Sequence, residues 1–104
     1  MKLTLIMPVY NSAVTVSKSI DSFKRLDEIL NIDCEFYIID DCSTDNTNPI
    51  VDNEIKSYQN IHLIKNNNNI GPGLSRNKAL EKINNGYVGF LDSDDEIIPK
   101  NYAK

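Results

Sequence analysis

The chain contains the stretch YVGFLDSDDE at residues 87–96, in which an apolar run leads directly into four carboxylates. The run at 87–91 predicts a strand, and the acids that follow are Asp92, Asp94, Asp95 and Glu96. Carboxylates this close repel one another unless a cation neutralises them. Mg²⁺ or Mn²⁺ is typically held by one or two carboxylates together with substrate phosphates. The stretch therefore indicates a metal–diphosphate site, although by itself it also fits a solvated acidic loop.

Toward the N-terminus, three more apolar runs predict strands at residues 61–64, 36–39 and 3–7, and we expect Pro8 to end the last of these. The runs are continuous, as in strands of a parallel sheet that are buried on both faces. Apolar residues at helical spacing predict a helix over 16–30 and a second with Val51, Ile55 and Tyr58 on its apolar side, capped by Ser43 or Asp45 and with Pro49 in its first turn. A third helix has Ala79, Leu80 and Ile83 on its apolar side; Arg76 lies one turn into it, and residues 84–86, Asn-Asn-Gly, end it. The order predicts an α/β fold: a Rossmann-like, mostly parallel sheet with flanking helices.

Composition limits the functional classes. The 104 residues suffice for one domain, and the net charge of −4 argues against nucleic-acid binding. No apolar stretch approaches the roughly 20 residues of a transmembrane helix, and the N-terminus does not resemble a signal peptide, so we expect a cytoplasmic protein. Cys34 and Cys42 are too few for a disulfide scaffold. The only histidine, His62, reads as a strand residue, which excludes a Ser-His-Asp or Cys-His enzyme.

Polar clusters follow the predicted strands, and ligands of open α/β sheets bind beyond the carboxyl ends of the strands. Residues 8–11, Pro-Val-Tyr-Asn, predict a shelf for a flat base or a ribose, or else a plain strand stop and turn. After the second strand, a carboxylate of the pair Asp40-Asp41 is predicted to accept from a ribose hydroxyl or a base N–H. The asparagine run 66–69 reads only as a polar turn. Arg76 suits a diphosphate, or else pairs with an acid of 92–96; both can hold.

These clusters together resemble the N-terminal half of family 2 glycosyltransferases, which have the GT-A fold. The resemblance covers essentially the whole chain and rests on four motifs in order: Pro8-Val9-Tyr10-Asn11; Asp40-Asp41-x-Ser43-x-Asp45-x-Thr47; Asn69-x-Gly71-x-x-x-Ser75-Arg76-Asn77; and Asp92-Ser93-Asp94-Asp95.

The resemblance implies an inverting transfer of a sugar from a nucleoside-diphosphate sugar, most often a UDP-sugar, to a hydroxyl of a glycan or glycoconjugate acceptor. It implies Mn²⁺ or Mg²⁺ at the pair Asp92 and Asp94. Asp94 would ligate the metal, and Asp92 would contact either the ribose or, through a water molecule, the metal. The nucleotide-binding residues that it implies are Pro8, Val9, Tyr10, Asn11, Asp41, Asn69, Gly71, Arg76, Asp92 and Ser93.

One departure from the family concerns length, since the chain stops ten residues after Asp94. Family members continue with the acceptor-binding part and the general base, and no residue here is assigned as that base. We therefore expect a truncated donor-binding half, inactive alone and prone to self-association through uncovered strand edges. The family's usual role is polysaccharide biosynthesis, which is compatible with peripheral association of the full enzyme at the inner membrane face.

Three alternative classes of protein share parts of this pattern. A sugar nucleotidyltransferase should carry a glycine-rich basic loop after the first strand, where this chain has Pro8 and no glycine. A response-regulator-like domain should carry its acidic pair there. A non-catalytic nucleotide-binding module remains open, although Asp92, Asp94 and Arg76 speak against it.

Overall fold

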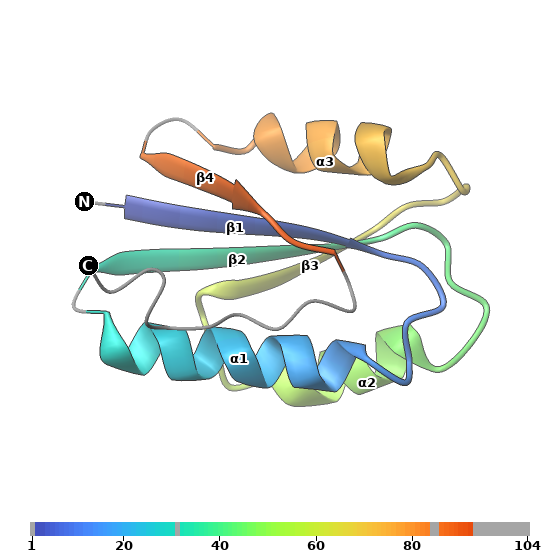
Figure 1. Cartoon of the computed structure of the whole chain (residues 1–104). Helices are drawn as coiled ribbons and strands as arrows, with labels where there is room; N and C mark the ends of the chain where they lie inside the picture. The colour runs from blue at the N-terminus through green and yellow to red at the C-terminus, as the bar shows by residue number, and fades with distance from the viewer. Residues whose placement is uncertain (1, 31, 84–85, 93–104) are drawn as a thin grey trace.

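The computed structural model describes residues 2–30, 32–83 and 86–92. Strands and helices alternate along them: β1 (Lys2–Val9), α1 (Val16–Ile29), β2 (Asp33–Asp40), α2 (Thr47–Ile55), β3 (Ile61–Lys65), α3 (Pro72–Leu80) and β4 (Tyr87–Phe90). The strands form one parallel sheet in the order β3-β2-β1-β4 (Figure 1). The predicted α/β fold with a parallel sheet and flanking helices is confirmed.

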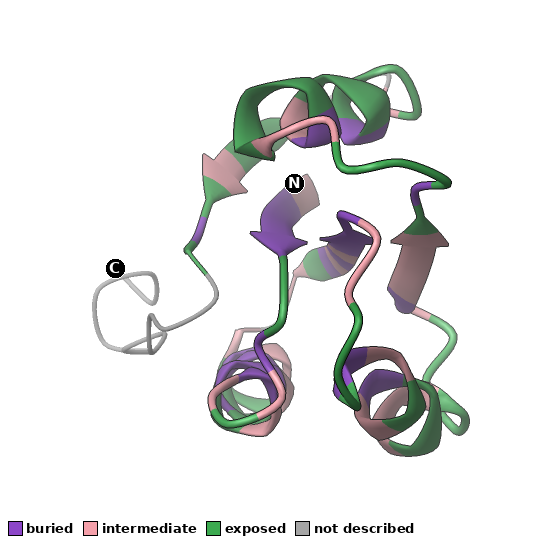
Figure 2. Ribbon diagram, turned by 90° about the vertical axis from the view of Figure 1, so that its right-hand side faces the viewer, coloured by how far each residue is buried: buried purple, intermediate pink, exposed green. Residues whose placement is uncertain are grey.

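The sheet is covered on both faces, by α1 and α2 on one side and by α3 on the other (Figure 1). Because side chains alternate along a strand, Leu5 and Met7 of β1 point into the larger core under α1 and α2, whereas Ile6 points toward α3. In the larger core, the rings of Phe23 and Phe36 stack with centroids 4.8 Å apart. Figure 2, viewed toward the carboxyl ends of the strands, shows the buried residues gathered in the central strands and on the inward sides of the helices.

The strand order reverses at β1. The chain moves outward from β1 to β2 to β3, and α3 then carries it back across the sheet so that β4 pairs with the other side of β1. All four carboxyl ends therefore lie at one edge, and the crevice beside β1 is the position where open α/β sheets bind ligands. Within the described residues, no helix combines the length and the apolar character needed to cross a bilayer.

Pro8 does not end the first strand, as the sequence had suggested: β1 continues to Val9, and Pro8 pairs with Ile39. Proline has no backbone N–H to donate, and the strand continues because the nitrogen of Pro8 faces the side of β1 where no ladder bond is needed. The carbonyl of Ile6 accepts from Leu91 on the β4 side, and Pro8, two residues on, faces the same way. The pairing of β1 with β4 ends at Ile6, so the proline costs the described sheet no ladder hydrogen bond.

Three further predictions need correction. Burial on both faces holds for the central strands, but β3 is half-buried and β4 is largely exposed because it lies at an edge. The second helix ends at Ile55, before Tyr58. The third begins at Pro72, one turn before Arg76 as predicted, but it ends at Leu80, before the stop predicted at 84–86, although Ile83 still packs on the core beneath α3.

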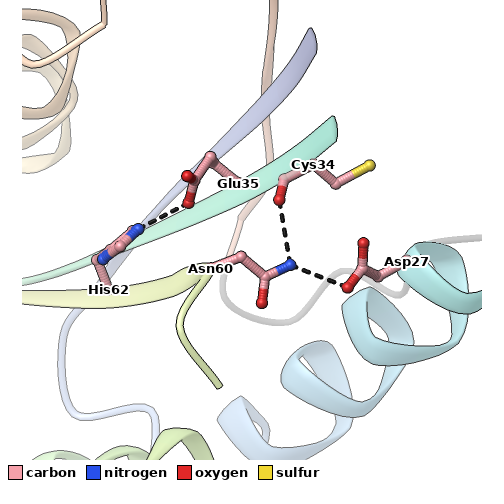
Figure 3. A network of polar contacts seen from close by, with 5 residues as sticks. All are labelled: Asp27, Cys34, Glu35, Asn60 and His62. Carbon is pink, nitrogen blue, oxygen red and sulfur yellow. Dashed lines mark hydrogen bonds and ion pairs between the residues drawn. The ribbon is translucent and has the colours of Figure 1, made fainter. Parts of the chain in front are cut away.

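Polar contacts tie the amino ends of β2 and β3 to α1 (Figure 3). Asn60 donates through Nδ2 to a carboxylate oxygen of Asp27 at 2.9 Å and to the carbonyl of Cys34 at 3.1 Å. His62 Nε2 lies 2.7 Å from Glu35 Oε2, and its ring stacks on that of Tyr37. His62 is thus a strand residue, as predicted, and both cysteines are free thiols.

Candidate nucleotide-binding site

An open pocket of about 230 Å³ lies at the carboxyl edge of the sheet. The pocket is formed by the ends of β1 and β2, the residue two positions past β4, and the start of α3. Its lining residues are Pro8, Val9, Tyr10, Asp41, Pro72 and Asp92. Since β1 lies between β2 and β4, the two carboxylates stand on either side of an apolar floor. The edge thus gathers residues that lie more than 80 positions apart in the chain.

The end of β1 gives the pocket a rigid apolar side. Pro8 and Val9 are buried in the sheet, and Tyr10, just beyond the strand, is 49% exposed. A ring that keeps half of its surface open beside a proline offers a flat face for stacking a planar ligand.

Asn11 follows in the left-handed region, at φ 47°, and its side chain serves the protein itself. Its Oδ1 accepts from the backbone N–H of Thr44 at 2.8 Å and of Asp45 at 3.3 Å, and its own N–H donates to the hydroxyl of Ser43. Asn11 therefore ties the loop after β1 to the loop after β2. Its predicted contact with the nucleotide stays a prediction.

The N-cap residue of the second helix is Asn46, which makes no side-chain capping bond, so neither Ser43 nor Asp45 is the cap as predicted; Asp45 instead bonds to Thr47 in the first turn. Asp45 Oδ1 accepts from the hydroxyl of Thr47 and from its backbone N–H at 2.9 Å, and Oδ2 accepts from the N–H of Ala13. These bonds, with the Thr47 hydroxyl as the largest contributor, hold the pKa of Asp45 below its ordinary value, although partial desolvation opposes them. Ser43 instead bonds to the buried Asp40.

Asp41 is 4% exposed, yet it lines the pocket. Its Oδ1 accepts from the N–H of Ile70 at 2.7 Å and from Asn66 Nδ2 at 3.1 Å, and its Oδ2 accepts from the N–H of Gly71 at 2.9 Å. Burial acts to raise the pKa of Asp41, but these donors and the nearby charge of Lys78 together lower it. The carboxylate is therefore ionised at neutral pH and can only accept.

Gly71 is required by this arrangement. Its φ of 87° lies in the left-handed region, and it precedes α3 so that its N–H turns toward Asp41. The predicted involvement of Gly71 in the site therefore takes the form of a contact with Asp41. Asn69, two residues earlier, is exposed and does not line the pocket.

Arg76 reaches from α3 to Asp92, a lining residue of the pocket: its Nη2 donates to Asp92 Oδ1 at 3.3 Å. Its guanidinium carbon lies 5.9 Å from the ring centroid of Phe90. The alternative expectation, that Arg76 pairs with an acid of 92–96, is thus confirmed. The pair is partly open to solvent, so it contributes little to stability. Arg76 Nε is buried and has no hydrogen-bond partner in the described part of the chain.

The remaining predicted residues, Ser93 and Asp94, lie outside the described residues, as do Asp95 and Glu96. Among residues 2–30, 32–83 and 86–92, no three His, Cys, Asp or Glu side chains come together as a metal group. Asp92, a hard oxygen donor at the pocket, suits Mg²⁺ or Mn²⁺ by its chemistry.

Two residues of the site were missed by the sequence reasoning. Pro72 lines the pocket from the first turn of α3; its position between Gly71 and Gly73 was the available signal. Asn66, which reads as a mere turn residue, is buried and bonds to Asp41. Its place directly after a strand, like that of Asp41, was the signal that could have found it.

Comparison with known proteins adds the family. A family model described as "Glycosyl transferase family 2" matches residues 4–104. The poly(ribitol-phosphate) beta-glucosyltransferase of Bacillus spizizenii is 37% identical over 98 residues, which make up 93% of this chain and 15% of that protein. The putative teichuronic acid biosynthesis glycosyltransferase TuaG of Bacillus subtilis is 38% identical over 94 residues, 90% of this chain and 36% of that protein. The chain thus spans a minor part of each relative.

Among solved structures, S. aureus TarS 1–349 in complex with UDP-GlcNAc superposes with a TM-score of 0.82 at 32% identity, covering 98% of this chain and 29% of that one. The mannosyltransferase PcManGT of Pyrobaculum calidifontis, in complex with GDP-Man and Mn²⁺, also reaches 0.82, over 97% of this chain and 30% of that one, but at 21% identity, which shows the shared fold alone.

Proposed function

Because the chain belongs to glycosyl transferase family 2, we propose that its pocket binds the nucleoside diphosphate of a nucleotide sugar and serves the inverting transfer of that sugar to a hydroxyl acceptor. The observation that carries the proposal is the convergence of an apolar shelf, an ionised Asp41 and Asp92, to which Arg76 donates, on one pocket at the carboxyl edge.

At one end of the pocket, we assign the nucleobase to Tyr10 and Asp41. A carboxylate that only accepts requires a donor on the ligand, and uracil and thymine present a ring N–H, as does guanine. The solved relative whose title includes UDP-GlcNAc supports a uridine nucleotide. We therefore propose a UDP-sugar as the donor.

At the other end, we assign the diphosphate to Arg76. Its guanidinium group suits phosphate oxygens, and its exposed contact with Asp92 can open without a large loss of stability. The buried Nε that lacks a described partner is consistent with a donor reserved for an anion.

We propose that Asp92 and Asp94 together hold Mn²⁺ or Mg²⁺, with Asn69 and Ser93 beside the nucleotide. When bound, such an ion supplies positive charge against the departing diphosphate. The role of Arg76 is the same in kind: it stabilises negative charge on the leaving group as the sugar departs. No described residue is assigned as the general base.

For the acceptor, we propose a hydroxyl of a glycan or glycoconjugate. The support comes from the relatives, whose names refer to poly(ribitol phosphate) and to teichuronic acid biosynthesis. The predicted cytoplasmic location, at the inner membrane face for a membrane-bound acceptor, remains part of this proposal. We also propose that the uncovered edge at β4 causes this chain to self-associate.

A nucleotidyltransferase is disfavoured by the end of β1, where Pro8 and the Asn11 contacts leave no glycine-rich phosphate loop. A non-catalytic nucleotide-binding module would share the pocket. An assay of sugar transfer from a UDP-sugar distinguishes the two, because the enzyme transfers the sugar and the module does not.

The test is calorimetric titration with UDP and CDP, each with and without Mn²⁺. We expect UDP to bind more tightly than CDP and Mn²⁺ to strengthen its binding. Asp41→Asn should lose about 10- to 100-fold in UDP affinity, since a hydrogen bond to a charged group contributes about 1.5–3 kcal/mol. Asp92→Asn should lose the effect of Mn²⁺.

The matched control is Asp27→Asn, which alters a carboxylate that also bonds to an asparagine but lies at the amino end of the sheet (Figure 3). It should bind UDP as the unaltered chain does. Absence of UDP binding, or equal UDP affinity for the Asp41→Asn variant and the unaltered chain, would contradict the proposal.

A further inference from the structure

Asn66 lies at the junction of three elements beneath the pocket. It follows β3 directly, it is 6% exposed, and its backbone N–H donates to the carbonyl of Asp40 at the end of β2. Its side chain bonds to β2 through Asp41 and to α3 through Ser75 and Lys78. A buried amide with all of these bonds has a single orientation.

The direction of that amide follows from its neighbours. Lys78 has only donors, so Asn66 must present Oδ1 to Lys78 Nζ at 2.9 Å. The carboxylate of Asp41 only accepts, so Nδ2 must face Asp41 Oδ1 at 3.1 Å, and its second hydrogen goes to the hydroxyl of Ser75 at 3.0 Å. The chain Lys78–Asn66–Asp41 therefore runs from a surface cation to the pocket.

The hydrogen bonds of Asp41 show which acceptor position of its carboxylate stays open to a ligand. A carboxylate oxygen accepts about two hydrogen bonds. Oδ1 already receives two, from Asn66 and Ile70, whereas Oδ2 receives one in the described chain, from Gly71. One acceptor position thus remains on the residue that lines the pocket. A base with one ring N–H between two carbonyls matches a single acceptor.

We propose that Asn66 is a positioning residue for the nucleobase: with Lys78 behind it, it fixes the carboxylate of Asp41 so that one acceptor on Oδ2 is offered to the ring N–H of uracil. This rests on the proposed function for the identity of the ligand. The placement of Asp41 by Asn66 itself does not depend on any ligand.

The charged groups around Asp41 come from each neighbouring element. Two of them are committed elsewhere, since Arg76 pairs with Asp92 and Lys65 with Asp52. Asp40 is occupied by Ser43 and Asn48. Lys78 is the cation that acts on Asp41, through Asn66.

The decisive variant is Asn66→Asp, which keeps the shape of the side chain and its oxygen toward Lys78 but places a second carboxylate against Asp41. Like charges at this distance favour a shared proton, so the pKa of Asp41 should rise. A protonated Asp41 donates instead of accepting. As the pH is lowered, the variant should therefore lose UDP-sugar binding at a higher pH than the unaltered chain does.

The matched control is Asn60→Asp. Asn60 also donates through Nδ2 to an aspartate and to a second oxygen, but at the opposite end of the strands (Figure 3). It should leave the titration of Asp41 unchanged. Lys78→Met, at an exposed position, should raise the midpoint of Asp41 in the same direction as Asn66→Asp but by less.

Two measurements test the proposal. Carboxyl carbon NMR of the ligand-free chain gives the titration midpoint of Asp41 in each variant. Calorimetry with UDP-glucose, whose diphosphate has no proton that titrates near neutral pH, gives the pH profile of binding. An unchanged midpoint of Asp41 in both Asn66→Asp and Lys78→Met would overturn the role of Asn66. Absence of UDP-glucose binding to the unaltered chain would overturn the proposed function, while the NMR result would still decide the role of Asn66.

Discussion

At the scale of the residue, Cys42 occupies a backbone conformation that usually selects glycine. Its φ is 67°, and it lies between Asp41 and Ser43, both of which are fixed by hydrogen bonds. The left-handed region costs a residue with a Cβ roughly 1–2 kcal/mol. The thiol recovers little of this, since its contact with the Asn67 carbonyl is 3.6 Å long.

We expect Cys42→Gly to be more stable than Cys42→Ala by about 1 kcal/mol, because both lose the thiol and only glycine relieves the backbone. Urea unfolding of the two variants measures the difference. Equal midpoints would show that the turn is not strained at this residue.

The residues of the pocket could be predicted in part. Each polar cluster after a strand had to reach the carboxyl edge, and this placed Tyr10, Asp41 and Asp92 correctly. The hydrogen-bond partners of these side chains could not be predicted from the sequence, because they depend on loops that fold back onto the strand ends. The bonds of Asp41 to Ile70 and Gly71, and the burial of Asn66, follow from the path of residues 66–71.

At the scale of the element, β4 is the strand that depends most on glycine. A Cβ on Gly86, whose φ is 90°, would lie 2.6 Å from the backbone oxygen of Lys2. A Cβ on Gly89 would lie 2.8 Å from Leu5 Cδ2, the end of a side chain that can shift. The backbone oxygen of Lys2 cannot move aside, whereas the side chain of Leu5 can.

Gly86→Ala should therefore lower the free energy of unfolding by about 2 kcal/mol or more, from left-handed strain and overlap together. Gly89→Ala should cost less, about 1 kcal/mol. Urea denaturation compares them. A Gly89→Ala variant less stable than Gly86→Ala would refute this account of how β4 packs on β1.

The strands were easier to predict than their limits. Apolar runs located all four, but Pro8 reads as a stop unless the partner on its open side is known to end at Phe90. The start of α3 was predictable, since Arg76 reads as one turn into the helix, but its end at Leu80 was not, because the apolar pattern continues to Ile83.

At the scale of the whole molecule, β4 forms one edge of the sheet within residues 2–30, 32–83 and 86–92. Tyr87 is 66% and Phe90 51% exposed, and the strand carries no charge. Among the described residues, β4 pairs with β1 alone. Such an edge, without lysine, proline or a bulge, favours pairing with another strand.

We expect sedimentation velocity to show concentration-dependent dimers of this chain. Val88→Lys, which places a charge on the edge, should shift the population to monomer. Val14→Lys, at a valine that is 96% exposed in the loop before α1, should not. A monomer at every concentration would contradict association through β4.

The α/β class and the parallel sheet were predictable because apolar runs and helical stripes alternate along the whole chain. The exposure of β4 was not readable from its composition, since Tyr-Val-Gly-Phe has the appearance of a core strand. Only the strand order shows that it has one neighbour.

The strand order also has a consequence for synthesis. Leu3 pairs with Tyr87, so β1 leaves the ribosome well before β4, the strand that pairs with its free side. Until then a nascent chain can assemble β1, β2 and β3 with their helices, and the Asp41 half of the pocket exists without the Asp92 half. Long-range closure of this kind is slow. Any nucleotide that spans both halves would hold β4 in place and so act as a template for the step that adds this strand to the sheet.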